Sequence, residues 1–284
     1  MLFSIIIPTR DRVDALDRCL ASLAALEFSP DQFEVLVVDD GSHRPVDEVV
    51  ARYGEHLPVR MLVQQNRGPA AARNLGLKNA RGRYVVFTDD DCRADAQWLR
   101  AYQQAFAEQP ESAWGGEILP APENSLAGVA AQLLVTYLYE YPVAHLRFFC
   151  TNNLAFPREA LAGLGGFDEH FPLAAAEDRD LCARWGTRYP LAYAPAARVY
   201  HRQELTFLGF LQQQFRYGRG AFHFQVRRRQ REEEPLRVEP LHFYARLLAY
   251  PWRSEDSPRA AALTMLLALS QLANFCGYSY ERRK

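Results

Sequence analysis

Several common sequence signals are absent from this chain of 284 residues. Its five cysteines are scattered and never form a CxxC pair, which argues against a disulfide framework or a zinc site and favours a reducing compartment. The net charge of −1 gives nucleic acid no bulk electrostatic attraction. The first residues lack the order of a signal peptide. We therefore expect a cytoplasmic protein that does not bind nucleic acid.

Three familiar motifs are also missing. The chain has no GxxxxGK(S/T) phosphate loop, no GxGxxG after a predicted strand and no GxSxG nucleophile elbow. The enzyme classes that these motifs mark are therefore not expected. Residues 260–280 carry no charge, but polar side chains interrupt them, so we expect a packed helix or a shallow membrane contact there.

The first half of the chain alternates strand and helix patterns. Buried strands are predicted at residues 2–8, 33–40, 59–65 and 83–88, and helices at 13–26, 45–53, 69–79 and 94–108. This alternation predicts an α/β protein with a Rossmann-like, mostly parallel sheet and helices on both faces. The second half is less regular, with a strand at 112–119, helices at 126–141 and 176–187, two short extended pieces around Pro195 and a helical tail.

Acidic loops follow three of the predicted strands. Ligands of parallel sheets bind beyond the carboxyl ends of the strands, so PTRDR, DDGSHR and DDDCR are expected on one rim. In the last loop, strand alternation would point Asp89 and Asp91 the same way and Asp90 elsewhere. Two such carboxylates suit a hard divalent cation. The alternative is a solvated turn that caps the following helix.

Two further positions allow a nucleotide site. Asp39 or Asp40 could accept a hydrogen bond from a base or a ribose, but an Asp-Gly turn capped by Ser42 fits equally well. Arg73 could stack on a base or bind phosphate, or simply lie on a solvated helix face.

The second half offers five more candidates. Glu177 and Asp178 begin a predicted helix, where the helix dipole stabilises carboxylates. Asp178 could instead take a proton from a hydroxyl if its side chain faces a pocket. Asn152 and Asn153 are either hydroxyl-binding groups or a satisfied polar break. His201 could be a metal or phosphate ligand or a structural histidine.

Five blocks of the chain resemble the family 2 glycosyltransferases, which have the GT-A fold. They are SIIIPTRDR, EVLVVDDGS, NRGPAAARNLGLKNARGRYVVFTDDDC, NNLAFPREALAGLGGFDEHF and EDRDLCARW, in the family's order over about residues 2–202. The resemblance implies transfer of a sugar from a nucleotide diphosphate sugar, first of all a UDP-sugar, to an acceptor hydroxyl with inversion. It also implies a divalent metal cofactor, Mn²⁺ or Mg²⁺.

The resemblance also implies roles for individual residues. Asp178 would be the catalytic base, and Asp91 would be the main metal ligand with Asp89 nearer the ribose and diphosphate. Which two of the three adjacent aspartates hold the metal stays open. The remaining nucleotide-sugar residues would be Pro8, Thr9, Arg10, Asp11, Asp40, Arg73 and Asp90. The acceptor side would hold Asn152, Asn153 and Glu177.

The implied domains are a GT-A catalytic domain, 1–202, and a mainly helical C-terminal extension, 203–284. The catalytic domain would divide into a nucleotide-binding half, 1–110, and an acceptor half, 111–202. No QxxRW signature of processive synthases follows residue 202, so we expect addition of one sugar in cell-surface glycan or glycolipid synthesis. The acceptor would be a glycan, a lipid-linked molecule or a small molecule.

The aromatic and arginine-rich stretch 207–229 could lie on the inner face of the membrane or pack on the catalytic domain. Two other functions stay open: a sugar-nucleotide nucleotidyltransferase, against which the glycine-free PTRDR loop argues, and a non-catalytic GT-A-like binding protein. The sequence does not predict the oligomeric state.

Overall fold

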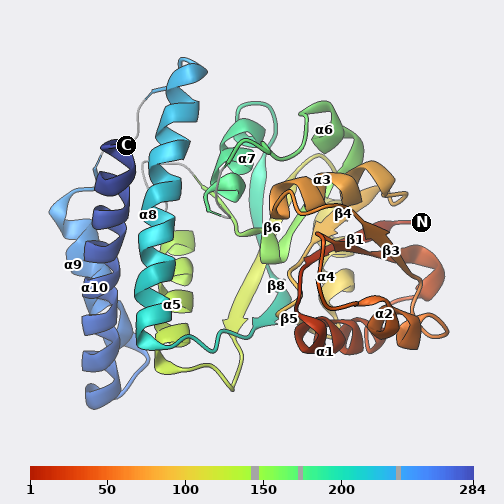
Figure 1. The fold of residues 1–284 in the computed structure, drawn as a ribbon, viewed down its shortest axis with the longest axis horizontal. Helices are drawn as coiled ribbons and strands as arrows, with labels where there is room; N and C mark the ends of the chain where they lie inside the picture. The colour runs from red at the N-terminus through yellow and green to blue at the C-terminus, as the bar shows by residue number, and fades with distance from the viewer. Residues whose placement is uncertain (142–146, 172–174, 235–237) are drawn as a thin grey trace. The chain divides into compact units, whose positions relative to one another are not determined.

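The computed structural model describes residues 1–141, 147–171, 175–234 and 238–284 (Figure 1). The chain forms two compact units, which we call the sheet unit and the helical unit. The sheet unit comprises Met1–Leu119, Phe148–Pro172 and Glu177–His201. The helical unit comprises Pro120–Arg147, Leu173–Ala176 and Arg202–Lys284. The division expected from sequence placed residues 120–141 in the catalytic domain, whereas here they group with the C-terminal helices.

Among the described residues, the sheet unit is built on one mixed sheet of eight strands in the order β3-β2-β1-β4-β7-β6-β8-β5. The strands are β1 (Phe3–Thr9), β2 (Phe33–Asp39), β3 (Val59–Val63), β4 (Tyr84–Phe87), β5 (Cys92–Ala94), β6 (Ala113–Pro120), β7 (Leu154–Pro157) and β8 (Leu191–His201). Strands β1 to β4 pair in parallel. Strand β7 runs antiparallel to β4 and β6, and β5 runs antiparallel to β8. The α/β class is confirmed, and the parallel part is the N-terminal half.

Helices cover this sheet because its strands are apolar on both faces. Every residue of β2 is buried, and so is every residue of β1 except Pro8. Figure 1 shows α3 and α6 on one side of strands β1 to β4, and α1 and α2 on the other. The helices of this unit are α1 (Val13–Ala24), α2 (Asp47–Tyr53), α3 (Pro69–Asn79), α4 (Trp98–Glu108), α6 (Arg158–Gly163) and α7 (Glu177–Gly186).

Two local predictions were wrong. Helix α4 starts at Trp98 rather than at Ala94, because residues 92–94 form β5 through their pairing with β8. Strand β8 is continuous through Pro195, where two pieces were expected. Its pairing with β5 involves only Val199–His201, so that ladder needs no N–H from Pro195.

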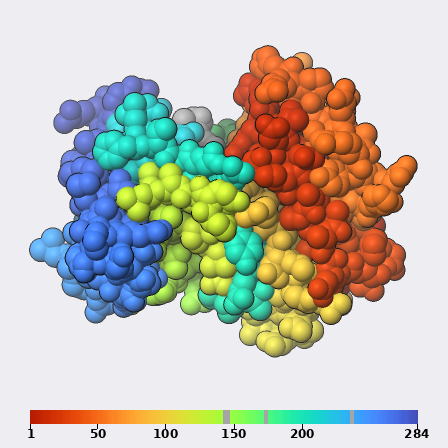
Figure 2. Space-filling model, turned by 90° about the horizontal axis from the view of Figure 1, so that it is seen from below, coloured from red at the N-terminus to blue at the C-terminus, as the bar shows by residue number. Residues whose placement is uncertain are grey.

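The helical unit contains α5 (Leu126–Glu140), α8 (Phe207–Gln230), α9 (Leu241–Ala249) and α10 (Ser257–Arg282). Figures 1 and 2 show α8, in cyan, beside α10, in blue. The two helices approach closely at glycines: a Cβ on Gly218 would lie 1.9 Å from the carbonyl oxygen of Asn274. Ala130, Phe210 and Leu263 form the core of this unit. On α10, Met265, Leu272 and Phe275 stay exposed.

Helix α3 lies close against β1 and β2 because residue 76 is a glycine. A Cβ on Gly76 would lie 2.4 Å from Cγ2 of Ile6 and 3.3 Å from Cγ2 of Val38, and both are branched side chains in the buried sheet. This close approach sets the position of the other α3 side chains, including Arg73.

We expect Gly76→Ala to destabilise the protein by about 1–3 kcal/mol, because the added methyl overpacks this contact. Gly163→Ala is the matched control, since it also adds a helical methyl but meets no atom within 4 Å. We expect that control to be neutral or stabilising by up to about 1 kcal/mol, from helix propensity. Denaturant unfolding measures both, and equal effects of the two substitutions would contradict the close approach.

Candidate active site

The loops after β1, β2 and β4 lie on one edge of the sheet. Parallel pairing places Thr9 opposite Asp39, and Ile6 opposite Phe87. The three acidic loops therefore start from neighbouring strand ends, where parallel sheets bind ligands.

Asp11 fastens the first loop to the second. Its Oδ1 accepts hydrogen bonds from the backbone N–H groups of His43 (2.6 Å) and Arg44 (3.1 Å), and its own N–H donates to Ser42 Oγ. The bond from Arg44 is the main cause that lowers the pKa of Asp11. Asp11 has a φ of 55°, a left-handed conformation that aspartate tolerates better than most residues. Arg10 beside it is exposed.

The β2 loop turns at Asp40 and Gly41, and Ser42 stabilises the turn. Asp39 Oδ1 accepts hydrogen bonds from the N–H and the Oγ–H of Ser42, so Asp39 fits the predicted turn rather than a nucleotide contact. Asp40 instead reaches the next loop: its carboxylate accepts from Gln64 Nε2 (2.7 Å) and from the backbone N–H groups of Arg67 and Gly68 (both 2.8 Å). Asp40 thus shapes the chain that leads into α3.

The three consecutive aspartates have three different surroundings. Asp90 is buried; it accepts from Thr9 Oγ1 (2.7 Å) and pairs with Arg12 (2.8 Å). The other nitrogen of the same guanidinium pairs with Asp91 at 2.8 Å. Asp89 faces away and pairs with Arg73, also at 2.8 Å. The alternation expected for a strand fails because β4 ends at Phe87 and the chain turns at Asp90 and Asp91.

These surroundings move the pKa values in opposite directions. Burial raises the pKa of Asp90 to about 7, despite the opposing charge of Arg12. Burial also acts to raise the pKa of Asp91, but the charges of His201 and Arg12 outweigh it and lower that pKa. Asp91 is therefore the permanently ionised member of the pair, which is the property a metal ligand needs.

His201 stands next to Asp91. Pairing of β5 with β8 places Cys92 opposite His201, and the imidazole Nε2 lies 3.3 Å from Asp91 Oδ1. Burial acts to lower the pKa of His201, but the Asp91 charge raises it overall. One ligand atom each of Asp91, Cys92 and His201 lies within 4.8 Å of the other two.

The groups around His201 fit a divalent cation of the Mn²⁺ type, which accepts carboxylate and imidazole ligands. Asn152 adds to this fit: its Nδ2 is 3.3 Å from His201 Nδ1, and its buried Oδ1 has no partner among the residues that the structure describes. A buried amide oxygen without a partner is costly, and a bound ion or its water would satisfy it.

Arg73 connects the aspartates to the start of α7. Its guanidinium is buried and pairs with Asp89 (2.8 Å) and with Glu177 (3.2 Å), while the Phe167 ring lies 5.6 Å from its central carbon. The solvated alternative for Arg73 is therefore excluded. Burial, followed by the neighbouring charge of Asp178, raises the pKa of Glu177 to about 7. Burial also raises the pKa of Asp178, whose Oδ1 accepts from the N–H of Arg179.

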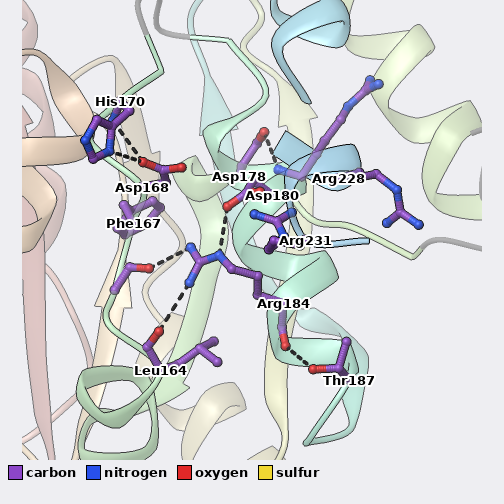
Figure 3. A network of polar contacts seen from close by, with 12 residues as sticks. Leu164, Phe167, Asp168, His170, Asp178, Asp180, Arg184, Thr187, Arg228 and Arg231 are labelled. Atoms are coloured by element: carbon purple, nitrogen blue, oxygen red, sulfur yellow. Dashed lines mark hydrogen bonds and ion pairs between the residues drawn. The ribbon is translucent and has the colours of Figure 1, made fainter. Parts of the chain in front are cut away.

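Helix α7 is anchored by a second arginine. Figure 3 shows Arg184 reaching Asp180 on its own helix and the backbone of Leu164 in the loop that follows α6. Its Nε donates to Asp180 (2.8 Å), and its terminal nitrogens donate to the carbonyls of Gly166 (2.7 Å) and Leu164 (3.4 Å). Asn74 of α3 holds the same loop by two bonds with the backbone of Phe167. These contacts tie α7, whose first residues are Glu177 and Asp178, and α3 to the same short segment, residues 164–167.

Asn153 has a structural task. Its Oδ1 accepts from Trp98 Nε1 (2.9 Å) and Tyr102 Oη (2.7 Å), and its Nδ2 donates to the carbonyls of Glu117 and Ala197 (both 2.8 Å). These four bonds use the full capacity of the amide. No capacity is left for an acceptor sugar, so the polar-break alternative describes Asn153.

Sequence reasoning missed Arg12 and the pair Asp180–Arg184. Arg12 ends the PTRDR block, and nothing in its spacing separates it from an ordinary surface arginine. Asp180 and Arg184 do carry a signal, the i, i+4 spacing of an ion pair on a helix.

Comparison with known proteins decides the family. The model of Glycosyl transferase family 2 matches residues 4–160, and that of Glycosyl transferase family group 2 matches residues 84–276. The chain belongs to glycosyl transferase family 2. The pre-mycofactocin glycosyltransferase of Mycobacterium tuberculosis is 30% identical over 237 residues, which are 79% of this chain and 47% of that protein. The chain therefore spans about half the length of this relative.

Solved structures support the GT-A fold of this family 2 glycosyltransferase. The mannosyltransferase PcManGT from Pyrobaculum calidifontis, in complex with GDP-Man and Mn²⁺, has a TM-score of 0.64 at 20% identity and covers 96% of this chain and 86% of its own. Residues 1–349 of TarS from S. aureus, in complex with UDP-GlcNAc, have a TM-score of 0.60 at 17% identity. This match covers 100% of the present chain and 93% of the TarS chain.

The raised pKa of Glu177 predicts a pH dependence of stability. The unfolded chain binds fewer protons at this side chain between about pH 4.5 and 7, so ionisation costs the native protein stability as the pH rises through that range. Glu177→Gln removes this titration. We therefore expect the free energy of unfolding of the variant, measured relative to that of wild type, to rise by on the order of 1–3 kcal/mol as the pH increases from 5 to 8.

Urea unfolding at pH 5, 6, 7 and 8 measures this difference. Glu159→Gln is the matched control, because the side chain of Glu159 is 89% exposed. A pH-independent difference between Glu177→Gln and wild type would show that Glu177 titrates normally.

Proposed function

We propose that this family 2 glycosyltransferase moves one sugar from a nucleoside diphosphate sugar to an acceptor hydroxyl, with inversion and with a divalent cation. The observation that carries the proposal is the buried bridge of Arg73 between Asp89 and Glu177. It joins the aspartate loop beside the candidate metal ligands to the acids of α7. One side of the network then serves the donor diphosphate, and the other serves the acceptor.

Asp91 and His201 would hold the metal, with Asn152 Oδ1 beside them. A bound Mn²⁺ or Mg²⁺ would stabilise the negative charge of the departing nucleoside diphosphate. The complex of PcManGT with Mn²⁺ supports this choice of cofactor. Asp90 is a weaker candidate for a metal ligand than Asp91, because its carboxyl contacts Thr9 and Arg12 and its pKa is raised.

Asp178 would act as the base. Burial raises its pKa, which strengthens it as a proton acceptor, and the Arg179 N–H fixes one of its oxygens. The second oxygen would take the proton of the attacking hydroxyl. Glu177, held by Arg73, would position the start of α7 rather than carry the proton itself.

The donor nucleotide would lie against the β1 and β2 loops. One wall of this nucleotide site would consist of Pro8, Thr9, Arg10 and Asp11. The other wall would be the backbone of residues 67 and 68, whose N–H groups donate to Asp40. UDP-sugars are our first choice of donor, and GDP-sugars come next, because the structural neighbours were solved with UDP-GlcNAc and GDP-Man.

We expect Asp178→Asn to lower donor turnover by at least about 10²-fold, as loss of a general base does. Asp91→Asn should lower it by a similar factor and remove its dependence on Mn²⁺. Release of nucleoside diphosphate from a panel of UDP- and GDP-sugars, with and without Mn²⁺, measures this effect.

Asp47→Asn on α2, which is exposed, is the control and should keep the wild-type rate. If both site variants also kept that rate with a working donor, the proposed roles would be wrong.

We also propose that the enzyme works at the inner face of the membrane on a lipid-linked or glycan acceptor. Among the described helices, α10 is long and apolar enough to cross a membrane by length and composition, and 33% of its most apolar window is buried. Its exposed side chains Met265, Leu272 and Phe275 precede the basic end at residues 282–284. Such a face suits an anionic lipid surface.

The double substitution Leu272→Glu with Phe275→Glu should lower the fraction of protein that sediments with phosphatidylglycerol vesicles severalfold, because it places two charges on the apolar face. Val63→Glu is the matched control, since Val63 is 62% exposed and lies on β3. Equal sedimentation of all three proteins would rule out this face as the contact.

A further inference from the structure

Arg12 makes an unusual double contact at the exit of β1. One terminal nitrogen lies 2.8 Å from Asp90 Oδ1, and the other lies 2.8 Å from Asp91 Oδ2. A planar guanidinium therefore spans the carboxylates of two consecutive residues. Because such charge-assisted bonds are among the stronger ones in proteins, both carboxylates are committed to Arg12.

Arg12 differs from the other arginine of the site in its freedom to move. The side chain of Arg73 is 5% exposed and lies between Asp89 and Glu177, whereas that of Arg12 is 49% exposed. About half of the Arg12 side chain therefore faces solvent, which gives it more freedom to move than the enclosed Arg73. Its partner Asp91 is 16% exposed.

Each oxygen of these two carboxylates already has a positive or donating neighbour. Thr9 donates to Asp90 Oδ2, and His201 lies beside Asp91 Oδ1, so Arg12 covers the two remaining oxygens. A divalent cation on Asp91 would stand close to the guanidinium, and like charges a few ångströms apart repel. The ion and Arg12 would therefore compete for this carboxylate.

We propose that Arg12 is a built-in counter-cation that competes with the divalent metal for Asp91 and moves to the donor diphosphate when both bind. The inference rests on the metal site of the proposed function. Diphosphate oxygens give the displaced guanidinium a new bidentate partner. Metal and nucleotide then bind cooperatively, because each favours the same position of Arg12.

Direct Mn²⁺ binding to the full chain tests this competition without any sugar transfer. Isothermal titration calorimetry without nucleotide should give about tenfold tighter Mn²⁺ binding for Arg12→Gln than for wild type, which is the order expected for loss of one competing charge-assisted contact. Arg52→Gln is the matched control: it removes the same charge from an exposed pair with Asp17 and should bind like wild type. Arg12→Lys, which cannot span both carboxylates, should fall between Arg12→Gln and wild type.

Cooperativity provides a second readout. UDP should tighten Mn²⁺ binding to wild type by a larger factor than it tightens binding to Arg12→Gln. Unchanged or weaker Mn²⁺ affinity in both Arg12 variants would overturn the competition.

Asp91→Asn separates this failure from that of the proposed function. If Asp91→Asn bound Mn²⁺ as tightly as wild type, the metal site itself would be wrong, and the role of Arg12 with it. If Asp91→Asn lost the ion while Arg12→Gln behaved like Arg52→Gln, only the counter-cation proposal would fail.

Discussion

The candidate site depends on one buried cation. Arg73 lies between Asp89 and Glu177, and without its charge three carboxylates, including Asp178, would share a poorly solvated space. Removing one partner of a buried ion pair is strongly destabilising, because the other charge is left uncompensated. Arg73 in turn has its place because Gly76 lets α3 lie close on β1 and β2. The packing of a single helix therefore determines where the acids meet.

The electrostatics of the site follow from how its acids are partnered. Asp91 has two cationic neighbours and a lowered pKa, whereas Asp90 and Glu177 each have one arginine, deep burial and a pKa raised to about 7. A string of adjacent acids thus becomes a set of groups with different charges at neutral pH. A permanent anion suits a metal, and Asp178, whose pKa burial also raises, suits proton transfer. This division of tasks supports the proposed glycosyl transfer.

Much of the fold could be predicted because its cues are local. The apolar runs of β1, β2 and β4 and the start of α3 at Pro69 are visible in the sequence, and their alternation predicts the parallel half. Strand β5 escaped prediction because its three residues acquire their conformation only by pairing with β8. The grouping of helix α5 with the C-terminal helices rests on packing at Phe210 and Leu263, far along the chain.

The sequence by itself determined which loops carry acids and on which edge of the sheet they emerge, because strand direction fixes that edge. It also determined the family, through blocks whose order is a property of the chain alone. Only the tertiary structure decided how each acid is used: that Asp89 pairs with Arg73, that Asp90 and Asp91 share Arg12, and that Asn153 is fully committed to the core. The physical reason is that pKa values and hydrogen-bonding capacity depend on neighbours distant in sequence, which become neighbours only after folding.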